Sequence, residues 1–332
     1  MVNNNINNFY DRIFNCSAGE DFARLAMEIF LYQSRHTPVY RDYLSAISVN
    51  PGQVKSAGEI PFLPVEFFKT HKVVAGDKPA TTRFTSSGTT GGRAAVHHVP
   101  DIAVYEECFT RGFEYFYGNL SQYCILALLP AYAGRQDSSL LYMVQKLMEK
   151  GGHPGSGFYL RDYDRLRKRL TEGESEGQKT LLLGVSFALL DFAESAEPVH
   201  LRNTIVMETG GMKGRREEII RDDLHKSLRS FFGVEKIHSE YGMTELLSQA
   251  YSQGDGIFRT PPWMRVSARE INDPFSGVTE GRAGGINIID LANFNTCSFI
   301  ATRDLGVVHS NGSFEVLGRY DYSEARGCNL MV

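Results

Sequence analysis

The stretch KTLLLGVSFALLDFAES, residues 179–195, joins an apolar run of strand length to the pattern of a short helix. The same order occurs at 123–150, where an apolar run precedes a helix over 138–150. It occurs again at 203–232, where a strand over 203–208 precedes a helix over 217–232, with Gly233 just beyond its end. The apolar side chains that share one face of this last helix are Ile219, Ile220, Leu224, Leu228 and Phe231. Strands that alternate with helices predict a largely parallel sheet covered by helices.

The segments on either side follow other patterns. Ser17 and Glu20 have the spacing of a capping box, and the residues after them predict a helix that runs to Gln33 and ends before Pro38. Residues 83–99 predict two short strands around a loop, 101–118 a helix, and 171–178 a surface loop. After residue 256, short β-prone runs separated by Gly, Asn and Asp, with a hairpin signal at Asn311-Gly312, predict an antiparallel unit.

These patterns give a domain plan. We expect an N-terminal helical segment over 1–56, an α/β core over 57–256, a β-rich subdomain over 257–319 and a short tail over 320–332.

Composition excludes several classes of protein. The 332 residues are 42% hydrophobic and 22% charged, with a formal net charge of −4, which is typical of a globular enzyme and argues against a broad nucleic-acid surface. No apolar run approaches the ~18 residues of a membrane span, and the first residues lack the layout of a signal peptide. The five cysteines are odd in number and widely spaced, which predicts no disulfide framework. A cytoplasmic, reduced protein is the expectation.

One motif suits phosphate binding. Glycines let the backbone turn and expose its N–H groups, and hydroxyls add uncharged donors, so a loop of Gly, Ser and Thr can wrap a phosphate chain. The loop is Thr85, Ser86, Ser87, Gly88, Thr89, Thr90, Gly91 and Gly92, followed by Arg93. It is not a Walker A loop, because no Gly-Lys-Ser/Thr follows at the required spacing. The alternative is a flexible linker.

A second motif, SEYGMTE at 239–245, follows the end of a predicted strand, where ligands of open α/β sheets bind. Tyr241, beside Gly242, offers a flat face for a base. Thr244 offers a hydroxyl to a phosphate, and Glu245 a hard oxygen to Mg²⁺. The alternative is a turn capped by Thr244.

Together the two loops, about 150 residues apart, resemble the phosphate loop and the YGxTE motif of the adenylate-forming superfamily. Thr209-Gly210-Gly211 resembles its adenine-pocket segment. Thr302-Arg303-Asp304 resembles the motif whose Asp holds the ribose hydroxyls, and Arg319 resembles the hinge-region Arg that also reaches the ribose. The segments at 60–73, 128–144 and 314–331 are similar to LuxE-type acyl-protein synthetases and to relatives of phenylacetate-CoA ligase.

The resemblance implies an α/β fold of two packed α/β sheets with a small β-rich subdomain. It also implies that ATP and Mg²⁺ convert a carboxylic acid to an acyl-adenylate, whose acyl group then passes to a thiol. Thr244, Glu245 and Arg93 are its implied catalytic residues, with Glu245 as metal ligand. The acceptor would be Cys328, an acyl-acceptor or carrier protein, or coenzyme A.

Two features depart from the superfamily. The phosphate loop ends Gly-Gly-Arg-Ala in place of Gly-x-Pro-Lys, so Arg93 would supply the positive charge. Only 13 residues follow Arg319, so the usual C-terminal domain and its lysine are expected to be absent. Two alternatives therefore remain: a catalytically reduced nucleotide-binding partner in a multi-protein complex, and an acid–CoA ligase.

Other candidates have plainer interpretations. His97-His98 could bind a metal, but adjacent side chains of a strand point opposite ways. Lys213 could form a Schiff base or be a surface charge. Ser186 could line the acyl pocket, act as a nucleophile although it lacks the Gly-x-Ser-x-Gly elbow, or simply cap a helix. Arg135 and Ser138, likewise, could touch substrate or be a loop charge and a helix cap. Cys328 could be an acyl acceptor or a small buried apolar side chain.

Overall fold

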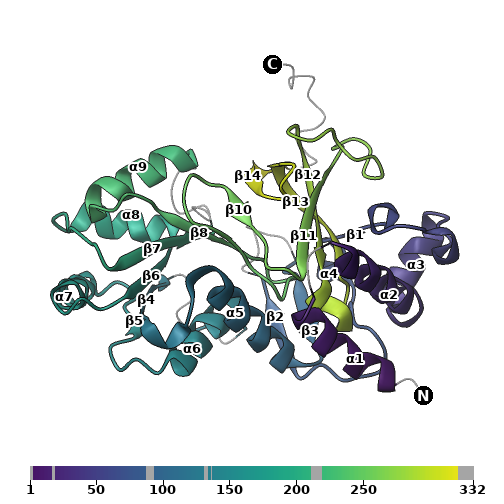
Figure 1. Ribbon diagram of the computed structural model, residues 1–332, viewed down its shortest axis with the longest axis horizontal. Coiled ribbons are helices and arrows are strands. Elements are labelled where there is room, and N and C mark those ends of the chain that lie inside the picture. Colours follow the sequence, from purple (N-terminus) through teal and green to yellow (C-terminus); the bar gives the residue numbers. More distant parts are fainter. Residues whose placement is uncertain are drawn as a thin grey trace. The chain divides into compact units, whose positions relative to one another are not determined.

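The computed structural model describes residues 3–16, 19–86, 93–130, 134–135, 137–210 and 219–320. The chain divides into two compact units, which Figure 1 colours along the sequence. Unit 1 comprises Met1–Thr81, His98–Pro100 and Pro262–Val332, and unit 2 comprises Thr82–His97 and Asp101–Pro261. Each unit therefore combines segments that are distant in the sequence.

Unit 2 is built on a sheet whose central strands are parallel. The strands are β4 (Cys124–Leu128), β5 (Gly157–Phe158), β6 (Thr180–Val185), β7 (Thr204–Thr209), β8 (His238–Tyr241), β9 (Ala250–Ser252) and β10 (Phe258–Arg259). Their hydrogen-bonded order is β10-β9-β8-β7-β6-β4-β5. Neighbours from β5 to β8 are parallel, and β8, β9 and β10 pair antiparallel. The predicted parallel sheet is confirmed.

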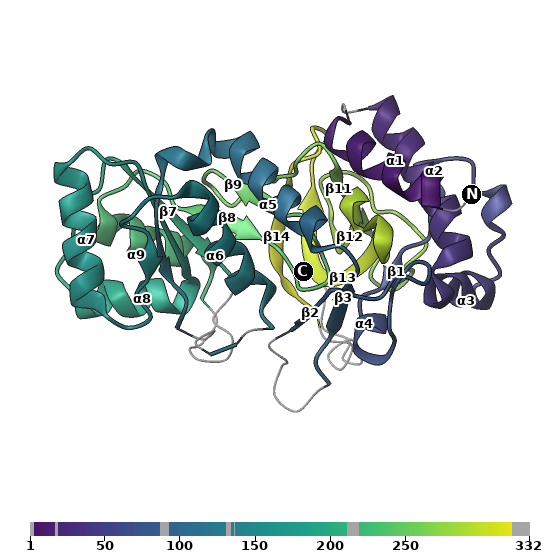
Figure 2. The same cartoon turned by 90° about the horizontal axis from the view of Figure 1, so that it is seen from below.

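Helices cover both faces of this sheet. They are α5 (Ile102–Tyr117), α6 (Ser139–Gly151), α7 (Tyr163–Ser175), α8 (Ser186–Ser195) and α9 (Arg221–Phe232). Helices α5 and α6 lie on one face and α8 and α9 on the other (Figures 1 and 2). Strands β4 and β6 are buried along their whole length, which explains why their sequences are continuously apolar.

Capping residues set several helix ends. The Asp101 carboxylate accepts the Ala103 N–H at 3.1 Å at the start of α5, and the Ser138 hydroxyl accepts the Leu141 N–H at 3.3 Å at the start of α6. Gly233 ends α9 in the left-handed conformation, at φ 63°. The expected cap at Ser138 is confirmed.

The short strands β2 (Thr82–Thr85) and β3 (Val96–Val99) form a separate two-stranded sheet. They flank the Ser/Thr/Gly loop, as the sequence predicts.

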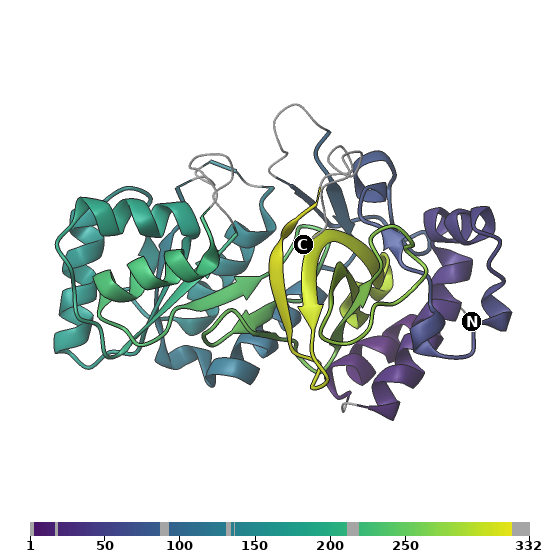
Figure 3. The same ribbon diagram turned by 90° about the horizontal axis from the view of Figure 1, so that it is seen from above.

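Unit 1 combines the N-terminal helices with an antiparallel sheet. Its helices are α1 (Asn3–Phe14), α2 (Glu20–His36), α3 (Pro38–Ala46) and α4 (Phe67–Thr70). Its strands are β1 (Leu63–Pro64), β11 (Met264–Arg269), β12 (Ala283–Asp290), β13 (Phe299–Val308) and β14 (Phe314–Arg319). The order is β11-β12-β13-β14, all antiparallel, with β1 parallel to β13. Figure 3 shows the last strands of this sheet from above, in yellow.

The predicted hairpin joins β13 to β14, with the Asn311 side chain accepting the Ser313 N–H at 2.9 Å and Gly312 at φ 78°. The resemblance implies two packed α/β sheets. The sheet of unit 1 is not a parallel α/β sheet, because its strands pair antiparallel except for β1.

Several elements differ from the predictions. Helices α1 and α3 were not predicted individually. Pro38 was expected only to end the preceding helical pattern, but it also begins α3, because proline fits the first turn of a helix. The predicted loop at 171–178 is partly helical, since α7 extends to Ser175. Helix α9 starts at Arg221, so Ile219 and Ile220 precede it and are 40% and 73% exposed. Ser17 lies outside the described residues.

None of the helices in the described ranges is long and apolar enough to cross a bilayer.

Candidate functional site

The carboxyl ends of β7 and β8 bring two of the predicted segments together. In this parallel pair Thr209 lies opposite Glu240, so the segment that begins Thr209-Gly210 and the segment Tyr241–Glu245 leave the sheet at the same edge. The Thr209 hydroxyl donates a hydrogen bond to the Glu240 carboxylate, which links the two strand ends directly. Gly210 has φ +63°, a left-handed conformation that favours glycine at this turn.

The YGMTE segment has both buried and open positions. Tyr241 and Glu245 are 9% and 7% exposed, whereas Gly242 is exposed and Thr244 half-buried. The Tyr241 ring packs edge-on against Phe258, with centroids 6.0 Å apart.

Described residues form no cluster of three acidic, His or Cys side chains that could hold a metal by themselves. Mg²⁺ commonly takes one or two carboxylates plus phosphate oxygens, so Glu245 beside Thr244 fits a Mg²⁺–nucleotide and not a free-standing metal site.

His97 supports this segment from β3. Its side chain is fully buried, and its Nδ1 lies 2.9 Å from the Thr244 carbonyl oxygen. Because a carbonyl only accepts, Nδ1 must carry the hydrogen. Sequence reasoning missed this contact. The only signal was the alternation along β3, which buries His97 and leaves His98 half-buried.

The start of the Ser/Thr/Gly loop is fixed by main-chain contacts. The Thr85 N–H donates to the Asp137 carbonyl at 2.8 Å, and Arg135 donates to the Thr85 and Ser86 carbonyls at 3.0 and 3.4 Å. Arg135 also pairs with the Asp137 carboxylate at 3.2 Å and holds its pKa below the usual range. Arg135 therefore anchors this loop through its backbone, a role that neither sequence interpretation included.

On the other side of the loop, the Ser86 hydroxyl accepts the Ala95 N–H at 2.9 Å. Arg93 is exposed. The predicted residues Ser87, Gly88, Thr89, Thr90, Gly91, Gly211 and Cys328, and the alternative Lys213, lie outside the described residues.

Unit 1 contains Asp304 and Arg319, the two residues that the resemblance implies for ribose binding. Asp304 on β13 lies opposite Arg319 on β14, and the Arg319 Nε is 3.0 Å from the Asp304 Oδ1. Asp304 is 5% exposed, whereas the Arg319 side chain is 68% exposed. The neighbouring Arg303 pairs with the Glu66 carboxylate.

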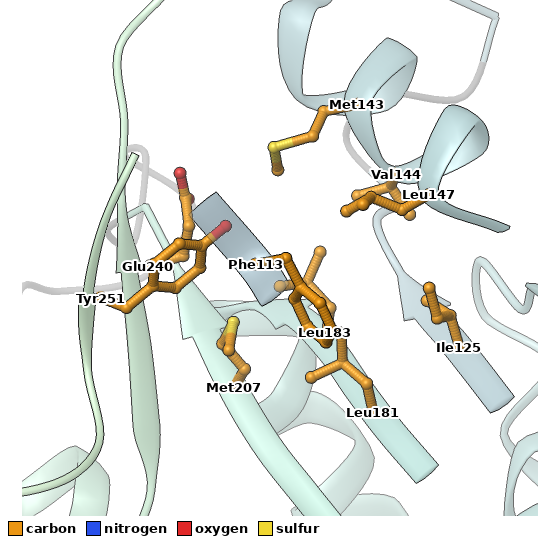
Figure 4. Close-up of a pocket in the computed structure, with 10 residues that line it drawn as sticks. All are labelled: Phe113, Ile125, Met143, Val144, Leu147, Leu181, Leu183, Met207, Glu240 and Tyr251. Atoms are coloured by element: carbon orange, nitrogen blue, oxygen red, sulfur yellow. The ribbon is translucent and has the colours of Figure 1, made fainter. Parts of the chain in front are cut away.

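A small apolar cavity lies in unit 2 beneath Glu240. It has room for about one water-sized sphere, with a volume of about 10 Å³. The lining residues are Phe113, Ile125, Met143, Val144, Leu147, Leu181, Leu183, Met207, Glu240 and Tyr251. In Figure 4 the oxygen-bearing side chains of Glu240 and Tyr251 lie together on one side, opposite Ile125 and Leu147.

No protein-family model and no curated protein matches this sequence. Solved structures do match. ATP-bound MatB from Rhodopseudomonas palustris is 17% identical with a TM-score of 0.54, over 85% of this chain and 58% of MatB. A 2-hydroxyisobutyryl-CoA ligase in complex with 2-HIB-AMP and CoA is 12% identical with a TM-score of 0.62, over 91% of this chain and 70% of the ligase. The fold is shared with acid–CoA ligases.

The long-chain-fatty-acid-CoA ligase FadD1 from Archaeoglobus fulgidus is 14% identical, with a TM-score of 0.52 over 72% of this chain and 51% of FadD1. This chain thus spans 58% of the length of MatB and about half that of FadD1. The mixed α/β architecture expected for an adenylate-forming enzyme is confirmed at the level of fold.

Proposed function

We propose that this chain uses ATP to activate a carboxylic acid as an acyl-adenylate. The observation that carries the proposal is the pairing of Thr209 with Glu240, which places the Gly210 and YGMTE segments at one sheet edge. This occurs in a fold shared with ligases whose structures contain ATP, or 2-HIB-AMP with CoA.

In the proposed reaction a carboxylate oxygen of the acid bonds to the α-phosphorus of ATP. The bond from that phosphorus to the bridging oxygen breaks, and pyrophosphate leaves with the electron pair. Backbone N–H groups and hydroxyls of the Ser/Thr/Gly loop, with Thr244, would hold the phosphates in line. Mg²⁺, held by Glu245, would offset their charge.

The other proposed roles rest on the resemblance to the adenylate-forming superfamily. Gly210 would face the adenine and Tyr241 would stack against it, while Asp304 and Arg319 would hold the ribose hydroxyls. Arg93, exposed beside the phosphate loop, would supply the positive charge that the superfamily motif obtains from lysine.

The cavity lined by Glu240 would have to widen before it could take the apolar part of the acid. Its walls are almost entirely aliphatic, aromatic or thioether groups, which favours an acid with an apolar body. A volume of about 10 Å³ is too small for such a group. Met143 and Met207, whose side chains are flexible and polarisable, are the walls best suited to shift.

A thiol would take the acyl group in the second half-reaction. Its sulfur bonds to the acyl carbon, the bond from that carbon to the phosphate oxygen breaks, and AMP leaves. The similarity to LuxE-type synthetases suggests Cys328 or a partner protein as acceptor. Coenzyme A is the second candidate, because a structure of similar fold contains 2-HIB-AMP with CoA.

Carboxylate-dependent exchange between pyrophosphate and ATP tests the first half-reaction. Screening fatty and aryl acids with Mg²⁺ should reveal acids that support exchange, and Glu245→Gln should abolish it at near-constant side-chain volume. Glu235→Gln, at an exposed carboxylate of the same unit, is the matched control and should be active. Exchange at the wild-type rate in Glu245→Gln would refute the assignment of this site.

Intact-mass spectrometry tests the acceptor. A hydroxylamine-labile adduct should form with ATP, Mg²⁺ and the active acid, and should be lost in Cys328→Ser but not in the control Cys16→Ser. An adduct that persists in Cys328→Ser, or exchange without any adduct, would move the acceptor to another residue, a partner protein or coenzyme A.

A further inference from the structure

A buried side-chain network lies directly behind Gly210. Ser186, the first residue of α8, is 2% exposed, and Glu208 on β7 is 5% exposed. The Ser186 hydroxyl oxygen lies 2.8 Å from the Glu208 Oε2 and 2.5 Å from the Gly210 carbonyl oxygen. The hydroxyl has one hydrogen to share between these two acceptors. Ser186 is therefore not the helix cap that the sequence suggested, since Val185 occupies the cap position.

Glu208 is held from a second direction by α9. Its Oε1 lies 3.8 Å from the Arg221 Nε and 3.6 Å from the His225 Nε2. Burial alone would raise the pKa of Glu208, but His225, Arg221 and the hydroxyls of Ser239 and Ser186 together hold that pKa below its usual range. The Glu208 carboxylate and the Gly210 carbonyl are both in position to accept the single hydrogen of the Ser186 hydroxyl.

These contacts fix the direction in which the chain leaves β7. Gly210 takes its left-handed turn one residue after the strand ends, and the Ser186 hydroxyl meets the carbonyl of that residue. Helix α8 meets the Gly210 peptide through Ser186, whereas α9 reaches only the Glu208 carboxylate behind it. The network therefore extends from α9 through Glu208 and Ser186 to the first peptide after β7.

We propose that Ser186 and Glu208 are positioning residues that set Gly210 for recognition of the nucleotide base. The inference rests on the proposed function, in which Gly210 faces adenine. Glu208 orients the Ser186 hydroxyl, and Ser186 orients the Gly210 peptide. Neither side chain touches ATP, so both act on nucleotide affinity and base preference and not on the chemical step.

Ser186→Ala is the main variant, and Ser195→Ala is its matched control. Ser195 ends the same helix, and its hydroxyl donates only to the Phe192 carbonyl of that helix, at 3.1 Å. Loss of a hydrogen bond that involves a charged group predicts an ATP dissociation constant about tenfold higher in Ser186→Ala. It also predicts a smaller preference for ATP over GTP. In Ser195→Ala both should match the wild type.

The readouts are calorimetric titration with ATP and with GTP, urea unfolding, and KM for ATP against kcat in pyrophosphate exchange. A higher KM with unchanged kcat, together with a reduced base preference, is the expected pattern. Ser186→Cys, which keeps similar volume and a weaker donor, should give intermediate affinity, and it replaces Ser186→Ala if that chain does not fold.

Wild-type ATP affinity and base preference in folded Ser186→Ala would overturn the inference while leaving the proposed function intact. Weakened ATP binding in the variant, with no exchange in the wild type, would support the positioning role and refute acid activation. A wild-type protein that neither binds ATP nor exchanges would refute both.

Discussion

Replacement of His97 by leucine should weaken the segment that carries Glu245. The imidazole is fully buried, and its Nδ1–H donates to the Thr244 carbonyl at 2.9 Å. Leucine fills a similar volume but has no donor, so the carbonyl next to Glu245 would lose its partner. Asparagine places an amide N–H close to the position of Nδ1 and can keep the bond.

The expected magnitude follows from the loss of this hydrogen bond to the Thr244 carbonyl. A part-buried acceptor left without a donor costs about 1–3 kcal/mol, whereas a retained amide donor recovers most of it. His97→Leu should therefore lower the free energy of unfolding by about 1–3 kcal/mol, and His97→Asn by clearly less. If the contact also orients Glu245, His97→Leu should need more Mg²⁺ for half-maximal pyrophosphate exchange.

Urea titration measures the first effect, and the dependence of exchange on Mg²⁺ concentration measures the second. Equal losses of stability in the leucine and asparagine variants would refute the hydrogen-bond argument, because only one of them lacks the donor. Lower stability with a wild-type Mg²⁺ requirement would restrict His97 to a structural role.

Three further predictions concern other parts of the chain. Asp304→Ala should weaken ATP binding by about 2 kcal/mol, and Arg319→Ala should weaken it by less, because the Arg319 side chain is 68% exposed and screened by solvent. Equal calorimetric affinities for ATP in the wild type and Asp304→Ala would show that Asp304 does not bind the ribose. Burial lowers the pKa of His238 to about 4, so the folded state favours the neutral imidazole, and up to about 3 kcal/mol of stability is present above pH 6.5 and lost as the pH falls toward 4. Between pH 7.5 and 4.5, the free energy of unfolding in urea should therefore fall less in His238→Gln than in the wild type, and an equal fall in both would contradict the lowered pKa. Arg135→Met should weaken ATP binding, because it removes the hydrogen bonds that Arg135 donates to the Thr85 and Ser86 carbonyls at the start of the loop. A calorimetric affinity for ATP equal to that of the wild type would show that these hydrogen bonds do not affect nucleotide binding.

Sequence patterns predicted the elements whose signals are local. The helices predicted over 101–118 and 138–150 match α5 and α6, Gly233 ends α9, and the apolar runs of β4 and β6 match their burial. Helix ends depend on hydrogen bonds to nearby backbone groups, and a continuously apolar strand is one that is buried on both faces. Both signals can therefore be read from a short stretch of sequence.

The elements that were missed lack such signals. Helix α1 begins in an asparagine-rich run with poor helix propensity, and α7 is so polar that its outer turns resemble a loop. Ile219 and Ile220 continue the apolar period of α9, but that helix begins only at Arg221. Periodicity alone does not reveal where a helix begins.

The candidate site divides in the same way. Its loops could be found in the sequence because glycine and hydroxyl side chains are concentrated there. Its supports could not, because His97 meets Thr244 across 147 positions and Ser186 meets Gly210 across 24. Contacts of that kind depend on strand order, which spacing along the chain does not encode.

The Asp304–Arg319 pair has a consequence for how a nucleotide would arrive. Asp304 is nearly buried, and the guanidinium that faces it is largely in water. A nearly buried carboxylate is costly unless polar or charged groups contact it. The exposed Arg319 guanidinium is one such contact, and it helps to hold the orientation of the Asp304 carboxylate. Because an exposed ion pair contributes little free energy, the two ribose hydroxyls of the proposed complex could replace the Asp304–Arg319 contact at low cost, and the Arg319 side chain could then turn to the same ribose.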